Sequence, residues 1–206
     1  MRHRFLQWLV LGLIAMSAGC ASVSTTKTRF YALSSADAPA PEKARNDVSI
    51  GLGPLEFPQM LDRPQIVTRE TSHRITRAEY HQWAGSLKRE FLQTLADQLE
   101  LILGTNRILI YPWNSRQRPD FQIRINISRF DGKLGGEVVL AARWQLFDER
   151  GKNELASGHS HIRVKVDGDG YADYVAALSR AVARFAAELG EYCQPSIAVR
   201  ASKSPR

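Results

Sequence analysis

The chain has 206 residues, of which 44% are hydrophobic and 24% charged, and its formal net charge is +7. A chain of this length can form one domain with a substantial core. The composition excludes a collagen-like protein, a fully disordered chain, a small disulfide-rich protein and a protein with several membrane spans, because their Gly/Pro period, charge excess, cysteine density or repeated apolar segments are missing. The positive charge suggests nucleic acid or an anionic membrane as a partner, and the cellular compartment decides between them.

The N-terminus has the pattern of an export signal. A basic start at residues 2–4 precedes an uncharged, mostly apolar stretch at 5–16. Because a helix needs about 20 residues to span a bilayer, this stretch is too short to cross one. Small residues at 17–19 then lead to Cys20, an order that resembles a bacterial lipobox, although Ser17 stands where Leu, Val or Ile is usual. An ordinary secretory signal that is cleaved elsewhere is the alternative.

The pattern predicts a lipoprotein that loses residues 1–19 and carries acyl chains such as palmitate on Cys20, with 20–27 as a short tether. Ala21 replaces the Asp of the inner-membrane retention signal, so the resemblance indicates the periplasmic side of the cell outer membrane. Nucleic acid is not expected as a partner there. Cys193 has no second cysteine to pair with once Cys20 is acylated, and we favour its burial as a small apolar side chain over an intermolecular disulfide.

Hydrophobic periodicity predicts one domain over residues 28–194. Alternation of apolar and polar residues indicates strands, and apolar residues at i, i+3 and i+4 indicate amphipathic helices. The predicted strands are 30–33, 48–52, 65–68, 73–78, 108–111, 121–128, 137–147 and 153–166, and the predicted helices are 86–103 and 171–189. We expect an α/β fold in which both helices pack on a mixed sheet that ends in an antiparallel meander. The basic residues 195–206 are expected to form a disordered tail.

Two patterns suggest ligand sites and are better explained as ordinary structure. Gly51 and Gly53 begin like a dinucleotide-binding loop, but the residues that follow break the motif, so the segment is interpreted as a strand end. His159 and His161 share one face of a predicted strand and would suit a metal ion. The sequence places no further ligands beside them, so a solvent-exposed face is favoured.

A third pattern resembles the start of a calcium-binding loop at Asp167, Asp169 and Gly170. The bidentate acid that such a loop needs would fall on Leu178, so we interpret the segment as a turn. Motifs for a catalytic serine, a phosphate-binding loop or a zinc protease are also missing from the sequence. We therefore expect no enzyme activity, no cofactor and no metal.

Large apolar residues gather in and beside the predicted loops. They are Phe57, Pro58, Leu61, Pro64, Tyr80, Trp83, Tyr111, Pro112 and Trp113. The favoured explanation is that they cover the sheet edge and the helix start. The alternative is a binding surface, because aromatic anchors together with Arg are typical of protein interfaces.

Several segments of the body form a recognisable set. They are 52–54, 61–69 with its Leu-Asp-Arg-Pro-Gln start, 80–87, 91–95, Phe130-Asp131-Gly132 and Trp144. Together they resemble the PqiC/YmbA lipoproteins, which are auxiliary lipoprotein components of ABC-type or MCE-type intermembrane transport systems. The resemblance covers nearly the whole chain after Cys20.

The resemblance implies an α/β fold and a non-catalytic outer-membrane lipoprotein. This protein would dock the periplasm-spanning MCE-domain protein of the PqiB type and support lipid transport and envelope integrity. Homo-oligomers and contact with phospholipid are further implications. We assign a candidate partner or self-association surface to Leu61, Asp62, Arg63, Tyr80 and Trp83. A periplasmic envelope scaffold unrelated to transport is the alternative, and a secreted metal-dependent hydrolase is a weaker one.

Overall fold

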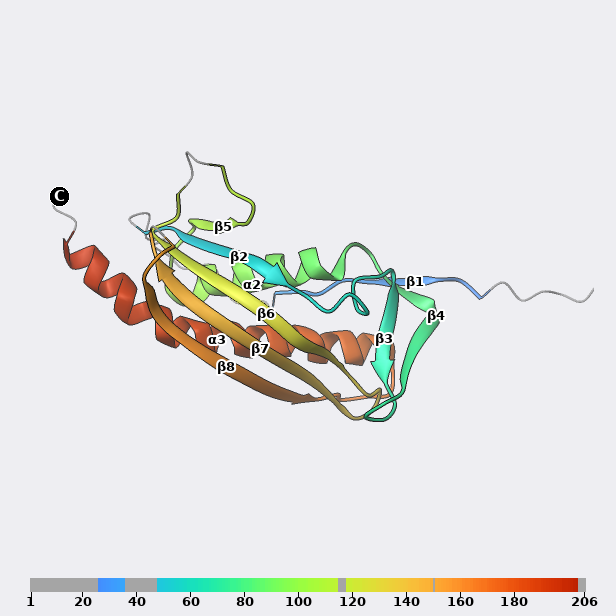
Figure 1. Cartoon of the computed structure of the whole chain (residues 1–206). Helices are drawn as coiled ribbons and strands as arrows, with labels where there is room; N and C mark the ends of the chain where they lie inside the picture. The colour runs from blue at the N-terminus through green and yellow to red at the C-terminus, as the bar shows by residue number, and fades with distance from the viewer. Residues whose placement is uncertain (1–25, 36–47, 115–117, 150, 204–206) are drawn as a thin grey trace, which may run out of the picture.

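The computed structural model describes residues 26–35, 48–114, 118–149 and 151–203 (Figure 1). Its strands are β1 (Arg29–Tyr31), β2 (Ile50–Glu56), β3 (Gln65–Arg69), β4 (Ile75–Trp83), β5 (Ile108–Ile110), β6 (Phe121–Gly132), β7 (Glu137–Asp148) and β8 (Glu154–Lys165), and its helices are α2 (Leu87–Leu103) and α3 (Tyr171–Lys203). The predicted α/β class is confirmed. The predicted signal, Cys20 and most of the tether lie outside the described residues.

The larger sheet has the strand order β5-β2-β6-β7-β8. Strand β2 runs parallel to both β5 and β6, whereas β6, β7 and β8 form an antiparallel meander, which confirms the meander predicted from the sequence. Along β6 every second side chain from Phe121 to Ile127 is buried, and the side chains between them are partly or fully exposed. The sheet therefore has one face in the core and one face toward solvent.

The smaller sheet has the order β1-β4-β3, with β1 parallel and β3 antiparallel to β4. The sequence analysis predicted a single sheet, and the structure has two. The reason lies in the segment after β2, where Pro58 and Pro64 lack the N–H groups that a continuing sheet would use. The chain turns there and β3 pairs with β4, at one end of the long strands (Figure 1).

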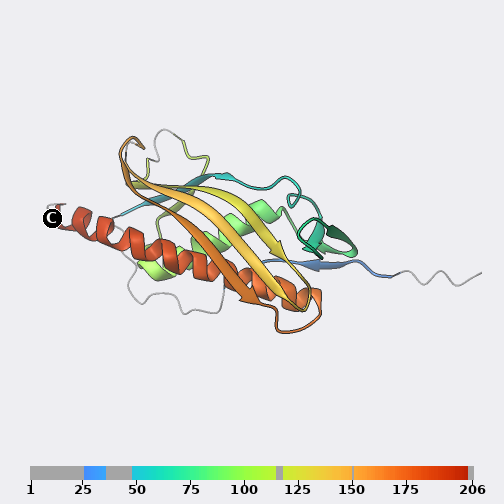
Figure 2. The same ribbon diagram turned by 60° about the horizontal axis from the view of Figure 1, so that its bottom comes forward.

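Helix α2 begins and ends where the sequence predicts. Ser86 is its N-cap and accepts a hydrogen bond from the Arg89 backbone N–H, and Gly104 ends it with a φ of 62°. Both helices lie on one face of the larger sheet (Figure 2). Phe91 of α2 meets Phe130 of β6 at 5.1 Å and Phe185 of α3 at 6.4 Å between ring centroids, so the helices and the sheet share one core.

Helix α3 is longer than predicted. The sequence analysis ended it at Leu189 and predicted a disordered tail over 195–206, but the helix continues through Pro195 to Lys203. That prediction is wrong as far as residue 203, and 204–206 lie outside the described residues. A proline inside a helix loses one hydrogen bond, but buried Cys193 and Ile197 continue the apolar stripe on either side of it.

Cys193 is a free cysteine with a side chain in the core, as the favoured interpretation predicted. Burial raises the pKa of its thiol to about 12, so the group stays protonated at neutral pH. Among the described helices, none is long and apolar enough to cross a membrane.

Removing the ring of Phe91 should destabilise the fold strongly. Phe91→Ala leaves a cavity between α2, β6 and α3, and we expect the free energy of unfolding to fall by about 3–5 kcal/mol. Urea unfolding followed by circular dichroism measures the change. Leu155→Ala is the matched control, because Leu155 is 46% exposed and should change stability little. Equal stability of the two variants would contradict the shared core.

Candidate functional site

The five residues predicted to form a partner surface divide into buried and accessible groups. Leu61 and Trp83 are 3% and 4% exposed, so their side chains belong to the core and contribute no exposed surface. Asp62 is exposed and accepts a hydrogen bond from Ser86 Oγ at 3.2 Å, which ties the loop before β3 to the start of α2. Tyr80 is 38% exposed. The accessible part of the predicted surface is therefore smaller than the sequence suggested.

Arg63 and Phe57 are partly buried, whereas Tyr111 is exposed. The Nε atom of Arg63 is buried without a hydrogen-bond partner among the described residues. Phe57 contacts the rings of Phe91 and Phe130 at 5.8 and 6.1 Å. Tyr111, directly after β5, is 48% exposed. The favoured explanation, that these residues cover the sheet edge and the helix start, therefore holds for Phe57, and Tyr111 remains on the surface.

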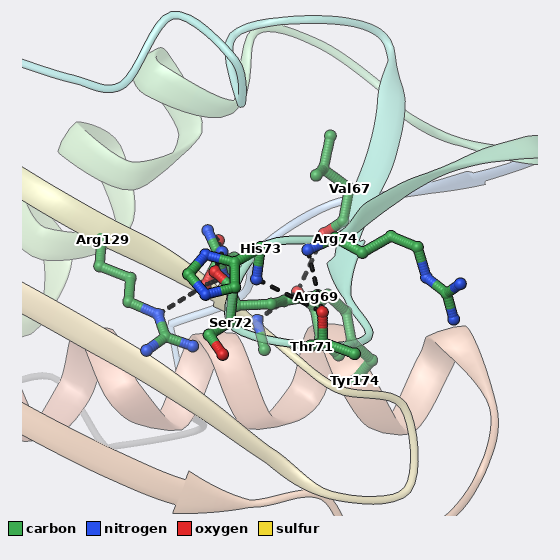
Figure 3. Close-up of polar contacts among 10 residues, drawn as sticks. Val67, Arg69, Thr71, Ser72, His73, Arg74, Arg129 and Tyr174 are labelled. Carbon is green, nitrogen blue, oxygen red and sulfur yellow. Dashed lines mark hydrogen bonds and ion pairs between the residues drawn. The ribbon is translucent and has the colours of Figure 1, made fainter.

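A buried carboxylate links the two sheets at the junction between them (Figure 3). Asp131, near the end of β6, is 2% exposed. Arg69 at the end of β3 donates to it from Nε at 3.1 and 3.0 Å and from Nη2 at 2.7 Å. Arg129 Nε donates to the same carboxylate at 2.7 Å. The hydrogen bonds to Asp131 raise the pKa of Arg69 above its ordinary value.

The same junction is held from the helix side by Tyr174 of α3 (Figure 3). Its hydroxyl donates to the Val67 carbonyl at 3.0 Å and accepts from the Gly132 backbone N–H at 3.0 Å. The ring is fully buried, and burial raises the pKa of the phenol. Tyr174 therefore bonds to β3 and to β6 at once.

The N-terminal strand is attached to the body through aromatic rings. The hydroxyl oxygen of Tyr31 in β1 lies 2.7 Å from His81 Nδ1. The imidazole of His81 stacks on the ring of Tyr171 in α3, with ring centroids 4.0 Å apart. Burial, followed by the charge of Arg29, lowers the pKa of His81. The neutral imidazole is therefore the form that this packing favours.

Directly after β1, the backbone is bound by both helices. The Leu33 N–H donates to Glu90 of α2 at 3.0 Å, and the Ser34 N–H donates to Ser179 of α3 at 3.2 Å. The segment that leads from the tether into the body is thus fixed on three elements, β4, α2 and α3.

A polar groove crosses the solvent face of the larger sheet. The strand register places Glu56, Asn126, Arg143 and His159 in one row across β2, β6, β7 and β8. These residues line a shallow cavity of about 690 Å³ together with Pro54, Arg124, Gln145 and Ser157. Asn126 donates to Glu56, whereas Arg143 makes no hydrogen bond or ion pair with another described residue. The groove can accept polar groups.

The exposed histidines of β8 do not form a metal site with other described side chains. His159 and His161 are exposed, and within the described ranges no three His, Cys, Asp or Glu residues are grouped to hold an ion. This agrees with the interpretation of that face as solvent-exposed. Two residues with structural contacts, Arg69 and His81, were not singled out from the sequence. Both lie in segments that carry the family resemblance, Arg69 in 61–69 and His81 in 80–87.

Comparison with known proteins identifies the family. Residues 31–190 match the family described as the ABC-type transport auxiliary lipoprotein component, and the chain belongs to this family. The match begins at Tyr31 in β1 and ends at Gly190 in α3, so it covers most of the packed body and stops before the buried Cys193 and Ile197. The resemblance to the PqiC/YmbA-type lipoproteins is thereby confirmed. No curated protein matches the chain in sequence.

Two crystal structures share the fold. Protein XCC0632 from Xanthomonas campestris aligns with a TM-score of 0.68 and 15% identity, over 85% of this chain and all of that one. A second structure, described only as that of an uncharacterized protein, aligns with a TM-score of 0.65 and 20% identity, over 82% of this chain and 99% of the other. At these identities the similarity shows a common fold.

Replacing the buried carboxylate should weaken the connection between the two sheets and lower the stability of the fold. Asp131→Asn removes the charge that pairs with Arg69 and Arg129, and we expect the free energy of unfolding to fall by about 1–3 kcal/mol. Thermal and urea unfolding measure the change. Asp167→Asn is the matched control, because its ion pair with Arg180 is solvent-exposed and should contribute about 0–1 kcal/mol. An equal loss in both variants would contradict the role given to Asp131.

Acid should loosen the attachment of β1. Because the pKa of His81 is lower in the folded state, the unfolded chain binds the proton more readily, and stability is lost as the pH falls below the ordinary histidine value of 6.5. Hydrogen exchange of the Leu33 and Ser34 amides, corrected for intrinsic rates, should show greater opening at about pH 5 than at about pH 7.5. His81→Gln should remove this dependence, whereas the exposed control His73→Gln should keep it. A pH dependence that survives His81→Gln would assign the effect to another group.

Proposed function

We propose that this protein is a non-catalytic auxiliary component of an intermembrane lipid transport system of the MCE type. In this proposal it is anchored by acylated Cys20 on the periplasmic side of the outer membrane, where it docks the periplasm-spanning MCE-domain protein. The observation that carries the proposal is the family match over residues 31–190, which covers the packed domain and not an isolated motif.

The arrangement of the body supports a docking role. One face of each helix is buried in the core. The solvent side of the larger sheet and the end formed by the smaller sheet are the two surfaces proposed for partners. The groove over Arg143 and His159 offers polar contacts on the first of these. Asp62 and Tyr80 offer accessible side chains near the second. The proposal includes self-association through either face, because several copies together can form a closed assembly around the end of a conduit that crosses the periplasm.

Fractionation and recovery of the partner test the proposal. The full acylated chain, carrying a C-terminal tag, should band with the outer membrane in a density gradient, and after cross-linking in cells it should recover a protein with MCE domains. Cys20→Ala should move the chain from the membrane to the soluble periplasmic fraction, because the acyl chains supply most of the membrane affinity. Mass spectrometry of the purified protein checks acylation directly.

Two variants separate docking from folding. Asp62→Lys changes an exposed side chain and should lower recovery of the MCE protein if the predicted surface is used. Lys152→Glu, an exposed change near the β7–β8 turn, is the control and should leave recovery unchanged. A chain that bands with the inner membrane, or that recovers no MCE-domain protein from cells that produce one, would overturn the proposal.

A further inference from the structure

Exposed aromatic side chains mark the smaller sheet. Phe30 in β1 is 65% exposed and Tyr80 in β4 is 38% exposed. The register pairs Phe30 with Gln82, and Tyr80 stands two residues before Gln82 on the same strand. The register of β4 is irregular between Arg77 and Gln82, but His81 packs on Tyr171 of α3. Its two neighbours, Tyr80 and Gln82, therefore project from the opposite, outer face, which is the face of Phe30. Isolated exposed apolar residues are common, but two aromatic rings on one small sheet need an explanation.

The position of the rings of Phe30 and Tyr80 relative to the tether provides an explanation for their exposure. Phe30 is ten residues from Cys20, and the described chain begins at Thr26, six residues from Cys20. Even fully extended, six residues span only about 20 Å. Strand β1 lies at one end of the molecule, far from the β7–β8 turn, in both views (Figures 1 and 2). If Cys20 is acylated, as the proposed function holds, this end is the part of the body nearest the bilayer.

The charges beside the rings match an anionic surface. Lys27 lies just before β1 and Arg29 lies in it, and both are exposed and make no ion pair with a described acid. The register pairs Arg29 with His81, so Arg29 projects from the face opposite Phe30, but it lies on an edge strand of the sheet. Glu79, next to Tyr80 in sequence, accepts a hydrogen bond from the Tyr80 hydroxyl and thereby raises the pKa of that phenol. Lysine and arginine attract lipid phosphates, and aromatic rings favour the boundary between headgroups and acyl chains.

We propose that the outer face of the smaller sheet is a second membrane contact, in which Phe30 and Tyr80 enter the headgroup region of an anionic phospholipid surface, and the positive charges of Lys27 and Arg29 beside this face are attracted to its phosphates. The acyl chains hold the protein at the bilayer, and this contact sets its orientation. The fixed backbone at Leu33 and Ser34 passes that orientation to both helices. The larger sheet and its polar groove then extend away from the membrane.

Lipid-quenching measurements on the acylated full chain test this contact. Phe30→Cys in a Cys193→Ala background is labelled with an NBD fluorophore and reconstituted into vesicles of phosphatidylethanolamine and phosphatidylglycerol. The same vesicles with brominated acyl chains should quench the label about twofold. Leu155→Cys, an exposed position at the start of β8, is the matched control and should be quenched little. A blue-shifted NBD emission at position 30 but not at 155 would support the contact independently.

Charge reversal tests the electrostatic part. Lys27→Glu combined with Arg29→Glu should reduce quenching at position 30 in vesicles with phosphatidylglycerol, whereas Lys152→Glu should not. Raising the salt concentration should reduce quenching in the parent and change it less in the reversed variant. Equal quenching before and after charge reversal would overturn the role of these two residues.

The outcomes distinguish this inference from the proposed function. A chain that floats with the vesicles and carries the acyl mass, but shows no more quenching at position 30 than at 155, overturns the second contact and leaves the anchor intact. A chain that lacks the acyl mass and does not float overturns the proposed anchoring itself. Emission at position 30 that shifts with protein concentration, without quenching by brominated lipid, assigns this face to a second copy of the chain and also overturns the inference.

Discussion

The hydrogen bonds that Asp131 of β6 accepts from Arg69 of β3 tie the two sheets of this protein together. The carboxylate is 2% exposed, so each charge-assisted bond to it acts where water competes little. Strand β3 is not paired with β6 in the sheet, so Asp131 and Tyr174 provide polar bonds between them. The smaller sheet is also held by its own buried side chains, and β1 by the backbone bonds that follow it. The family match spans both partners in the junction.

Local pattern was enough to predict the elements of the fold. The alternation along β6 and the caps at Ser86 and Gly104 are properties of short segments, so they can be predicted from the local sequence without knowledge of the rest of the fold. Pro58 and Pro64 mark where β2 cannot continue, but a local pattern does not say which strands then pair, so the division into two sheets was not predicted. The predicted end of α3 was wrong for a related reason. A proline at 195 argues against a helix locally, and the burial of Ile197 that outweighs it is set by tertiary packing.

The candidate surface was predicted less well than the fold. Residue type suggested that Leu61, Trp83 and Tyr80 would act together, but the structure buries the first two and exposes the third. Aromatic and aliphatic side chains serve cores and interfaces equally, so composition alone cannot assign them. The family resemblance, in contrast, rested on a sequence of neighbouring residues and was confirmed. The histidine that packs between Tyr31 and Tyr171 lies in a segment that carries the family resemblance, but its partners come from 50 residues before it and from α3, so the sequence did not show its packing.

The bonds from Leu33 and Ser34 to α2 and α3 have a mechanical consequence. If the protein is anchored through Cys20 and docks a partner, as proposed, force between membrane and partner would reach β1 first. Three paired residues alone would separate under such a load. Because the chain continues between two helices and is hydrogen-bonded to each, the load would pass into the longest elements of the body, and several bonds would have to break together before the N-terminal segment detached.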